Sequence, residues 1–392
     1  MSNLPNIKFN IAKDGLGQLQ ADIKKLPALV ITGVTVTGTD KVTIGKSNQI
    51  FSLAEAVRLG IEPTGANAFA YKHIAAFYEK ALTGAELWFM LTLATTTMED
   101  MADVTKDFAK KLVADAKGKV RFVGLLKKAS AGDVIANGLD ADVDKAVVKG
   151  QALAEYFEKL YFPIRVLISG NNFDGTVANL KDYNLSNYNK VAVLIANTDG
   201  AKEAAIGMAV GRLANIPVQR KLHRIKDAAV EPFNAYFTNG ATAESLTDAW
   251  EAINAKGYIF LKSFAGRSGY FFTTDQTLTA SNDDFKSLSN GFVMDKAILI
   301  AYDSLLEELS DEIPVTVTGT IHPAIIKSWQ NKIDAQLRGL MVNKGELSNV
   351  KIFIDENQNV LSTSNIAVGI SLLPVGYAEF ITVNIGFTTK LE

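Results

Sequence analysis

Residues 163–169 read PIRVLIS, a nearly continuous apolar run of strand length. Four similar runs lie in the first half of the chain, at residues 28–36, 86–94, 119–126 and 190–196. Strands that are covered on both faces have continuous apolar sequences of this kind, and stretches with helical spacing separate the runs. The sequence therefore predicts a central α/β sheet domain, which we place at residues 21–257.

The stretches between the runs have helical signals of their own. Thr97 suits an N-cap, and apolar residues then recur at three- and four-residue steps, at Met98, Met101, Val104, Phe108 and Leu112. This spacing predicts a helix that includes Met98 to Leu112. Further along, Gly207 and Gly211 lie four residues apart in a helical stretch, where they would let another backbone approach closely.

The pattern changes after residue 257. Apolar runs at 258–264 and 270–274 flank Gly266-Arg267-Ser268-Gly269, which predicts two strands joined by a turn. Two long helices are expected next, at about residues 283–309 and 323–341, and three strand-like runs follow at 350–354, 366–373 and 379–388. One face of the second helix combines Ile325, Trp329, Ile333, Leu337 and Leu340, and we expect Trp329 and Ile333 to pack in the core. These elements predict an α+β domain at residues 258–378.

The composition excludes several classes of function. The chain has 392 residues, 48% of them hydrophobic, which is enough for a sizeable core. Its formal net charge of -2 provides no basic field for direct binding of nucleic acid. Because there is no cysteine, disulfides, thiolate metal sites and cysteine nucleophiles are excluded. The N-terminus shows no secretory pattern and the apolar runs are too short for a membrane helix, so we expect a cytosolic product without a membrane anchor.

Two segments resemble ligand-binding motifs but lack essential residues. Thr43-Ile44-Gly45-Lys46-Ser47 ends like a P-loop, yet Asp40 stands where that motif requires its first glycine, and a carboxylate would repel phosphate. Residues 355–359 begin like a calcium-binding EF-hand loop, but Val360 replaces the glycine of the sharp turn. The three histidines, His73, His223 and His322, are far apart in the sequence. We therefore expect no cofactor, no metal and no enzymatic activity.

An enzyme is nevertheless the alternative from another class. Parallel sheets often bind ligands at the carboxyl ends of their strands, so residues 28–257 also fit a cytosolic α/β enzyme that uses a small cofactor. No catalytic arrangement of residues favours this alternative.

The two ends of the chain alternate apolar and polar residues, as strands with one apolar face do. At the N-terminus these apolar residues are Ile7, Phe9 and Ile11, and at the C-terminus they are Ile381, Val383, Ile385 and Phe387. Burying four such side chains contributes roughly 6–12 kcal/mol, whereas ordering about ten backbone residues costs roughly 10–20 kcal/mol. The C-terminal strand therefore needs a sheet to join, either in its own domain or in a second copy of the chain.

Several segments resemble the tail sheath proteins of contractile phage tails. In the C-terminal third they are residues 319–329, Gly345-Glu346-Leu347, residues 350–355 and residues 383–387, and before them Asn197-Thr198-Asp199-Gly200, the glycine-containing helical stretch 204–213 and residues 216–219. The resemblance implies a multi-domain α/β protein, in which a central α/β sheet domain is followed by an α+β sheath core domain with terminal β-strand arms. The arms would be residues 1–20 and 379–392.

The resemblance also implies a function. Sheath subunits polymerise as helical or hexameric layers around a tail tube, contract to drive it through the target cell envelope, and keep contact through arms that complete a sheet in adjacent copies. The implied partners are the chain itself, a tail tube protein, and baseplate and tail terminator proteins, without direct contact to nucleic acid or membrane. The implied location is a virion tail assembled in the bacterial cytoplasm; the sheath of an R-type bacteriocin or of a contractile secretion system fits equally well.

Overall fold

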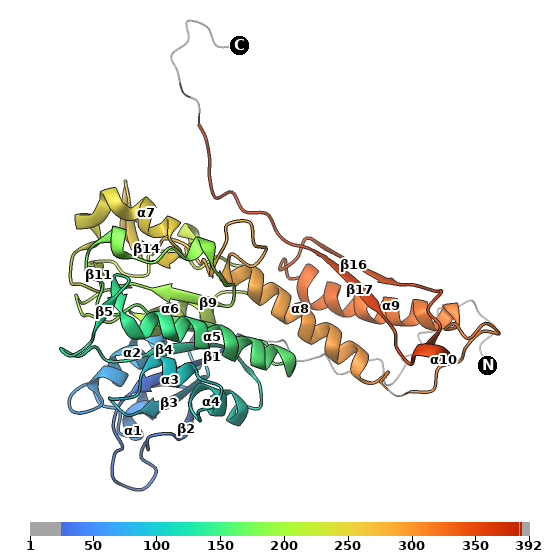
Figure 1. Ribbon diagram of the computed structural model, residues 1–392, viewed down its shortest axis with the longest axis horizontal. Coiled ribbons are helices and arrows are strands. Elements are labelled where there is room, and N and C mark those ends of the chain that lie inside the picture. The colour runs from blue at the N-terminus through green and yellow to red at the C-terminus, as the bar shows by residue number, and fades with distance from the viewer. Residues whose placement is uncertain (1–24, 310, 384, 386–392) are drawn as a thin grey trace, which may run out of the picture.

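The computed structural model describes residues 25–309, 311–383 and 385. The molecule is elongated: a large sheet domain lies at one end, and a smaller unit of two helices and a hairpin lies at the other (Figure 1). The helix α8 (Leu288–Leu306) begins beside the sheet and extends into the smaller unit. The predicted α/β class is confirmed. The borders that we place at residues 20, 257 and 378 remain a prediction.

A seven-stranded sheet forms the centre of the large domain. In spatial order its strands are β12 (Tyr258–Ile259), β9 (Val191–Leu194), β7 (Arg165–Ser169), β4 (Val120–Leu126), β1 (Leu26–Thr32), β3 (Leu87–Thr92) and β2 (Ser47–Ile50). Neighbouring strands run parallel except for β2, which is an antiparallel edge strand. The five apolar runs of the sequence are therefore five parallel strands, β1, β3, β4, β7 and β9.

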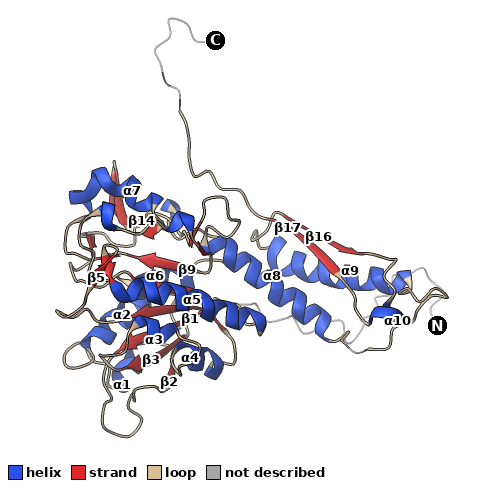
Figure 2. Cartoon of the chain, viewed as in Figure 1, coloured by secondary structure: helices blue, strands red, loops and turns tan. Residues whose placement is uncertain are grey.

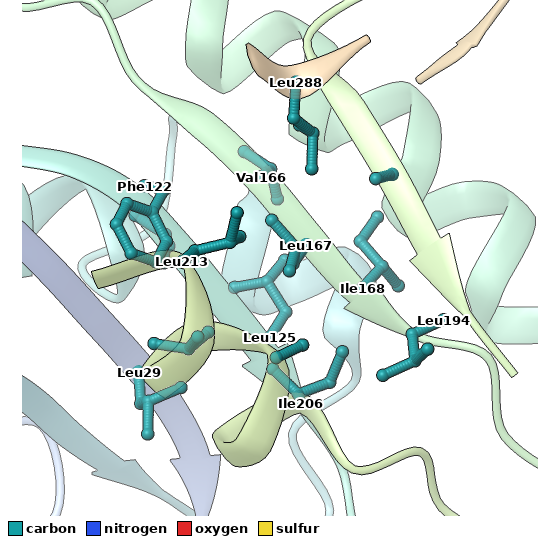
Figure 3. Packing of buried hydrophobic residues seen from close by; sticks show 14 of the residues in the cluster. Leu29, Phe122, Leu125, Val166, Leu167, Ile168, Leu194, Ile206, Leu213 and Leu288 are labelled. Atoms are coloured by element: carbon teal, nitrogen blue, oxygen red, sulfur yellow. The ribbon is translucent and has the colours of Figure 1, made fainter. Parts of the chain in front are cut away.

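Helices cover both faces of this sheet. One face packs against α2 (Ala68–Lys80) and α6 (Ile206–Asn215), and the other against α3 (Met98–Ala102), α4 (Ala109–Asp115) and α5 (Ala141–Lys159). The side chains between these layers form one continuous core, part of which Figure 3 shows around Leu125, Val166 and Leu167. Because both faces are covered, the strands need apolar residues at nearly every position.

The single helix predicted after Thr97 is wrong. Thr97 caps α3 as expected, since its side chain accepts a hydrogen bond from the Asp100 backbone N–H, but the helix ends at Ala102. The Asp103 carboxylate accepts hydrogen bonds from the backbone N–H and hydroxyl of Thr105 and pairs with Lys149 on α5. This local bonding competes with the helix, so that α4 begins only at Ala109.

Gly207 and Gly211 allow the close approach that their spacing predicts. A Cβ atom at Gly207 would lie 2.0 Å from the His73 carbonyl oxygen, and one at Gly211 would lie 2.4 Å from the Phe77 carbonyl oxygen. Both carbonyls belong to α2, so only glycine lets α6 pack against it at this distance.

The smaller unit consists of the distal half of α8, α9 (Pro323–Leu337) with a π-helical turn at Arg338–Val342, and the antiparallel strands β16 (Asn349–Ile354) and β17 (Val368–Leu373). The buried face of α9 has Ile326, Trp329 and Ile333, while Ile325 and Leu340 are half-buried. Trp329 and Ile333 thus pack in the core as expected. The predicted limits of the first helix, 283–309, were too wide at both ends of α8, whereas the predicted end of the second helix at 341 lies in the π-helical turn that continues α9.

The remaining elements are short (Figure 2). The helices are α1 (Leu53–Arg58), α7 (Trp250–Ala255), α10 (Val360–Thr363) and 3-10 turns at Val177–Asn179, Tyr183–Leu185, Ile225–Asp227 and Ala243–Ala249. The strands are β5 (Ile135–Ala136), β6 (Leu139–Asp140), β8 (Asn187–Tyr188), β10 (Ala196–Asn197), β11 (Tyr236–Phe237), β13 (Leu261–Phe264), β14 (Arg267–Phe272) and β15 (Leu278–Thr279). β13 and β14 pair as the predicted strand–turn–strand. None of the helices in the described ranges has both the length and the apolarity for a membrane span.

Candidate assembly interface

The β16–β17 hairpin is a sheet with one covered face. Its inner face pairs Val350 with Leu372 and Ile354 with Val368, and β16 packs against α9. The outer face includes Phe353, which is exposed. Within residues 25–309, 311–383 and 385, the two strands pair only with each other. Each strand therefore has a second edge whose backbone N–H and C=O groups face no further strand of the described chain, and such edges are templates for another strand.

The chain leaves this hairpin at Leu373 and continues as an unpaired segment, residues 374–383 (Figure 1). The first part of the segment is held against the sheet domain. The Tyr377 hydroxyl donates a hydrogen bond to the Gln219 carbonyl oxygen, and Lys221 Nζ lies 4.7 Å from the centre of the Tyr377 ring. The Glu379 carboxylate lies 3.1 Å from His223 Nε2. Burial beside Asp275 and Glu379 raises the pKa of Tyr377 to about 12, so its hydroxyl stays a donor near neutral pH.

These contacts end at Glu379, and the apolar residues after it are exposed. Ile381 is 79% exposed, Val383 75% and Ile385 95%. The run predicted as a strand at 379–388 forms no strand in its described part, residues 379–383 and 385. These residues therefore have a strand pattern without a sheet. Ile7, Phe9, Ile11 and Phe387, the other predicted contact residues, lie outside the described residues.

The contacts at Tyr377 and Glu379 were missed at the sequence level. They join positions 158 and 156 residues apart, Gln219 with Tyr377 and His223 with Glu379. No periodicity predicts such a pair. The one available signal is local: Tyr377 and Glu379 are polar-ended residues directly before an apolar run.

The other end of the described chain, Lys25, is also fixed. Its side chain is buried, its Nζ donates a hydrogen bond to the Pro217 carbonyl oxygen, and the same Nζ lies 5.0 Å from the centre of the Phe292 ring on α8. Burial lowers the pKa of Lys25 to about 7, although Asp275 and Glu346 partly offset this effect.

Lys25→Met is expected to stabilise the protein, and more so at pH 7 than at pH 10. Between the folded pKa of about 7 and the ordinary Lys pKa, the unfolded chain binds a proton that the folded chain does not, so stability of the native sequence falls as the pH is lowered through that range. The variant lacks this dependence. We expect it to gain roughly 2–4 kcal/mol at pH 7, because one pKa unit corresponds to about 1.4 kcal/mol, and little at pH 10.

Denaturant unfolding of both proteins at several pH values measures this difference. A difference in the free energy of unfolding between the two proteins that is the same at pH 7 and pH 10 would contradict the prediction.

The enzyme alternative places a ligand at the carboxyl edge of the sheet. Ion pairs and hydrogen bonds within the protein occupy charged groups at this edge. Lys127 Nζ lies 3.0 Å from Asp133 and 2.7 Å from Asp140, and its carbonyl oxygen accepts a hydrogen bond from Asn171. An open groove of about 840 Å³ beside α2 extends to this edge. Its charged residues include Lys72 and Asp199, which pair with each other at 2.9 Å. Lys127 and Asp140 at this edge, and Lys72 and Asp199 in the groove, are thus paired within the protein.

The motif-like segments have ordinary structural roles. Gly45 lies in the turn before β2, so Ser47 begins an edge strand where a P-loop would begin a helix. In the acidic segment, the Asp355 side chain accepts a hydrogen bond from the Asn357 backbone N–H, as in a polar turn. His322 caps α9, and the pKa of buried His73 is lowered well below its usual value by desolvation. In the described part of the chain, no three His, Cys, Asp or Glu residues are grouped so as to hold a metal ion.

Comparison with known protein families shows which family models match this chain. The model of the DUF2586 N-terminal domain matches residues 4–276, and that of the DUF2586 C-terminal domain matches residues 284–392. No curated protein matches the chain.

Three solved structures have a similar fold. A chain of the anti-feeding prophage baseplate has a TM-score of 0.61 and 15% identity, covering 99% of this chain and 100% of its own. A chain of the contracted PVC sheath complex of an extracellular contractile injection system has a TM-score of 0.59 and 12% identity, covering 100% and 98%. The sheath tail protein of Listeria innocua has a TM-score of 0.51 and 8% identity, covering 90% and 95%. At these identities the likeness concerns the fold, which agrees with the resemblance found in the sequence.

Proposed function

This chain belongs to the DUF2586 family and has the fold of contractile sheath proteins, and we propose that it is a sheath subunit that polymerises around a tail tube. A subunit of this kind acts through its contacts with other copies. Its partners would be further copies of the chain, the tube protein, and the baseplate and terminator proteins that bound the polymer.

The observation that supports this function best is the combination of an open sheet and an unpaired strand in one chain. The β16–β17 hairpin has two edges without a strand partner in the described residues, and residues 381–383 and 385 belong to an apolar strand pattern but pair with no sheet there. In our proposal, the C-terminal segment of one copy pairs with the hairpin of a neighbour, and the N-terminal residues Ile7, Phe9 and Ile11 pair in the same way. Each copy then both donates strands and accepts them.

Such a contact is heterologous, because the donated strand and the accepting edge are different surfaces. Heterologous contacts that do not close generate a helix, which is the geometry of a sheath. Contraction would follow if the bodies repack while the strands stay paired. The donated strands would keep the copies connected during that movement, and no nucleotide would be needed.

We place the polymer in a tail of the contractile type, assembled in a bacterial cytoplasm. Similar folds occur in an anti-feeding prophage and in an extracellular contractile injection system, so the proposal covers a phage tail, a bacteriocin and a secretion apparatus alike.

Negative-stain electron microscopy of the purified full-length chain tests the function. We expect tubes with a helical repeat, formed either by the chain alone or after addition of its tube protein. A monomer or a small closed oligomer under both conditions would contradict the sheath function, and a bound small cofactor in such a particle would support the enzyme alternative instead.

A further inference from the structure

Helix α8 has an apolar stripe that is covered at one end only. Phe292, Leu299, Tyr302 and Leu306 lie on one face of the helix, and the charged Asp295 interrupts this stripe at its covered end. Near the sheet the stripe is buried, because Phe122 packs on Phe292 at 5.6 Å between ring centres and Arg165 pairs with Asp295. Further along, Tyr302 is 42% exposed and Leu306 46%.

The uncovered half of the stripe is part of a larger apolar surface. Tyr161, just after α5, stacks on Tyr302 with 4.7 Å between ring centres and 22° between ring planes. Tyr161 has a φ of 61°, a left-handed backbone conformation that is costly for a residue with a side chain, and its ring is exposed. Leu160 and Phe162 beside it are exposed as well. The opposite face of α8, with Ile300 and Ser304, is buried.

The first described residue lies at the covered end of this stripe. Lys25 contacts the ring of Phe292, so the described chain begins beside α8. From Phe292 to Leu306 is fourteen helical positions, or about 21 Å at 1.5 Å per residue. A segment of 24 residues is long enough to follow the stripe to its end even as a helix.

The sequence of that segment matches the stripe. Leu16, Leu19 and Ile23 have steps of three and four residues, as Leu299, Tyr302 and Leu306 do. We propose that residues 16–23 bind along the exposed half of α8 in their own chain, in antiparallel direction, with Ile23 nearest Leu299 and Leu16 nearest Leu306. Because the segment is tethered at Lys25, its effective concentration at this surface is on the order of millimolar, which favours it over a second copy in dilute solution.

This binding would fix where the N-terminal strand leaves the molecule. With residues 16–23 along α8, Ile7, Phe9 and Ile11 emerge toward the α9 end of the molecule, on the side of the β16–β17 hairpin, and not beside the sheet. The inference concerns the single chain and does not depend on polymer formation.

Disulfide cross-linking tests it, and the absence of cysteine from the native sequence makes the test specific. Two variants each introduce one pair, Leu19→Cys with Tyr302→Cys, and Leu16→Cys with Leu306→Cys. Under mild oxidation at low micromolar concentration, we expect most of the full-length monomer to form an intramolecular disulfide. The product is identified by its shifted mobility on non-reducing gels and by peptide mass.

A control variant pairs Leu19→Cys with Leu93→Cys, since Leu93 is exposed just after the carboxyl end of β3, at the opposite edge of the sheet. It should remain reduced. The proposal is overturned if both test pairs remain reduced while their thiols react freely with a maleimide, or if they form only cross-linked dimers, which would assign the surface to a second copy. Since the assay uses monomer, a chain that fails to polymerise still gives a decisive result.

Discussion

Removal of residues 379–392 is expected to abolish polymer formation and to leave the folded body intact. In the single chain, Phe380, Ile381 and Val383 are largely exposed, and Glu379 contributes only a partly exposed pair with His223, so the body loses little when they are deleted. In the polymer, each copy would lose the burial of about four apolar side chains, which is roughly 6–12 kcal/mol per contact. We expect an unchanged thermal unfolding midpoint and no tubes by negative-stain microscopy.

Point variants test whether polymer formation requires the apolar face of the arm or only the presence of the segment. Ile381→Glu with Val383→Glu places two charges on the face that would be buried, and it should have the effect of the deletion. Thr382→Glu, on the alternate face of the same strand, is the matched control and should still assemble. Long tubes from the truncated chain that resemble those of the native chain would show that the arm is not required.

Much of the large domain was predictable because its strands are buried on both faces. A run such as residues 163–169 has an unusual density of apolar residues, and only a strand inside a two-sided α/β layer requires it. The edge strand β2 lacked this signal, because only two of its four residues, Asn48 and Ile50, are buried, and only Ile50 is apolar. Sequence alone therefore predicted the centre of the sheet and missed its antiparallel edge.

The break between α3 and α4 was unpredictable for another reason. The apolar spacing continues through Val104 and Phe108, yet the Asp103 side chain bonds to Thr105 and to Lys149. Lys149 lies 46 residues away in the sequence on another helix. A tertiary contact thus decided a local boundary that the periodicity alone assigned to one helix.

At the candidate interface, too, the sequence predicted one feature and missed another. The one-sided pattern at residues 381–387 predicted a strand that needs a sheet, either in its own domain or in a second copy, and the described part of that run is unpaired. The contacts of Tyr377 and Glu379 depend on how the loop at 219–223 folds, so no local pattern revealed them. Contact of the apolar residues of both ends with a neighbour remains a prediction, and the deletion tests its C-terminal part.

Two adjacent charges on α8 connect the two parts of the molecule. Asp295 pairs with Arg165 on β7 of the sheet domain, and Lys296 pairs at 2.7 Å with Glu346, in the turn before β16. All four side chains are buried. A movement of the hairpin unit relative to the sheet would have to break at least one of these buried ion pairs, so we expect the sheet domain, α8 and the hairpin unit to move as one rigid piece.

Arg165→Ala is accordingly expected to have the largest effect on stability. Arg165 donates two hydrogen bonds to the Asp295 carboxylate, at 2.8 and 2.6 Å, and one each to the carbonyl oxygens of Asn189 and Gly291. The substitution leaves the Asp295 charge buried without its partner, which costs about 3–5 kcal/mol. Chemical denaturation at neutral pH measures the loss.

The double variant Arg165→Met with Asp295→Leu tests whether the unpaired Asp295 charge, and not the loss of the other contacts of Arg165, causes the destabilisation. Replacing both partners of a buried ion pair by apolar residues of similar volume is often neutral or stabilising, so the double variant should recover most of the loss. Equal destabilisation in the single and double variants would show that the hydrogen bonds to Asn189 and Gly291, and not the uncompensated carboxylate, determine the effect. In that case the connection of α8 to the sheet would depend on backbone bonding around Arg165, and the ion pair would contribute little to the rigidity that we infer.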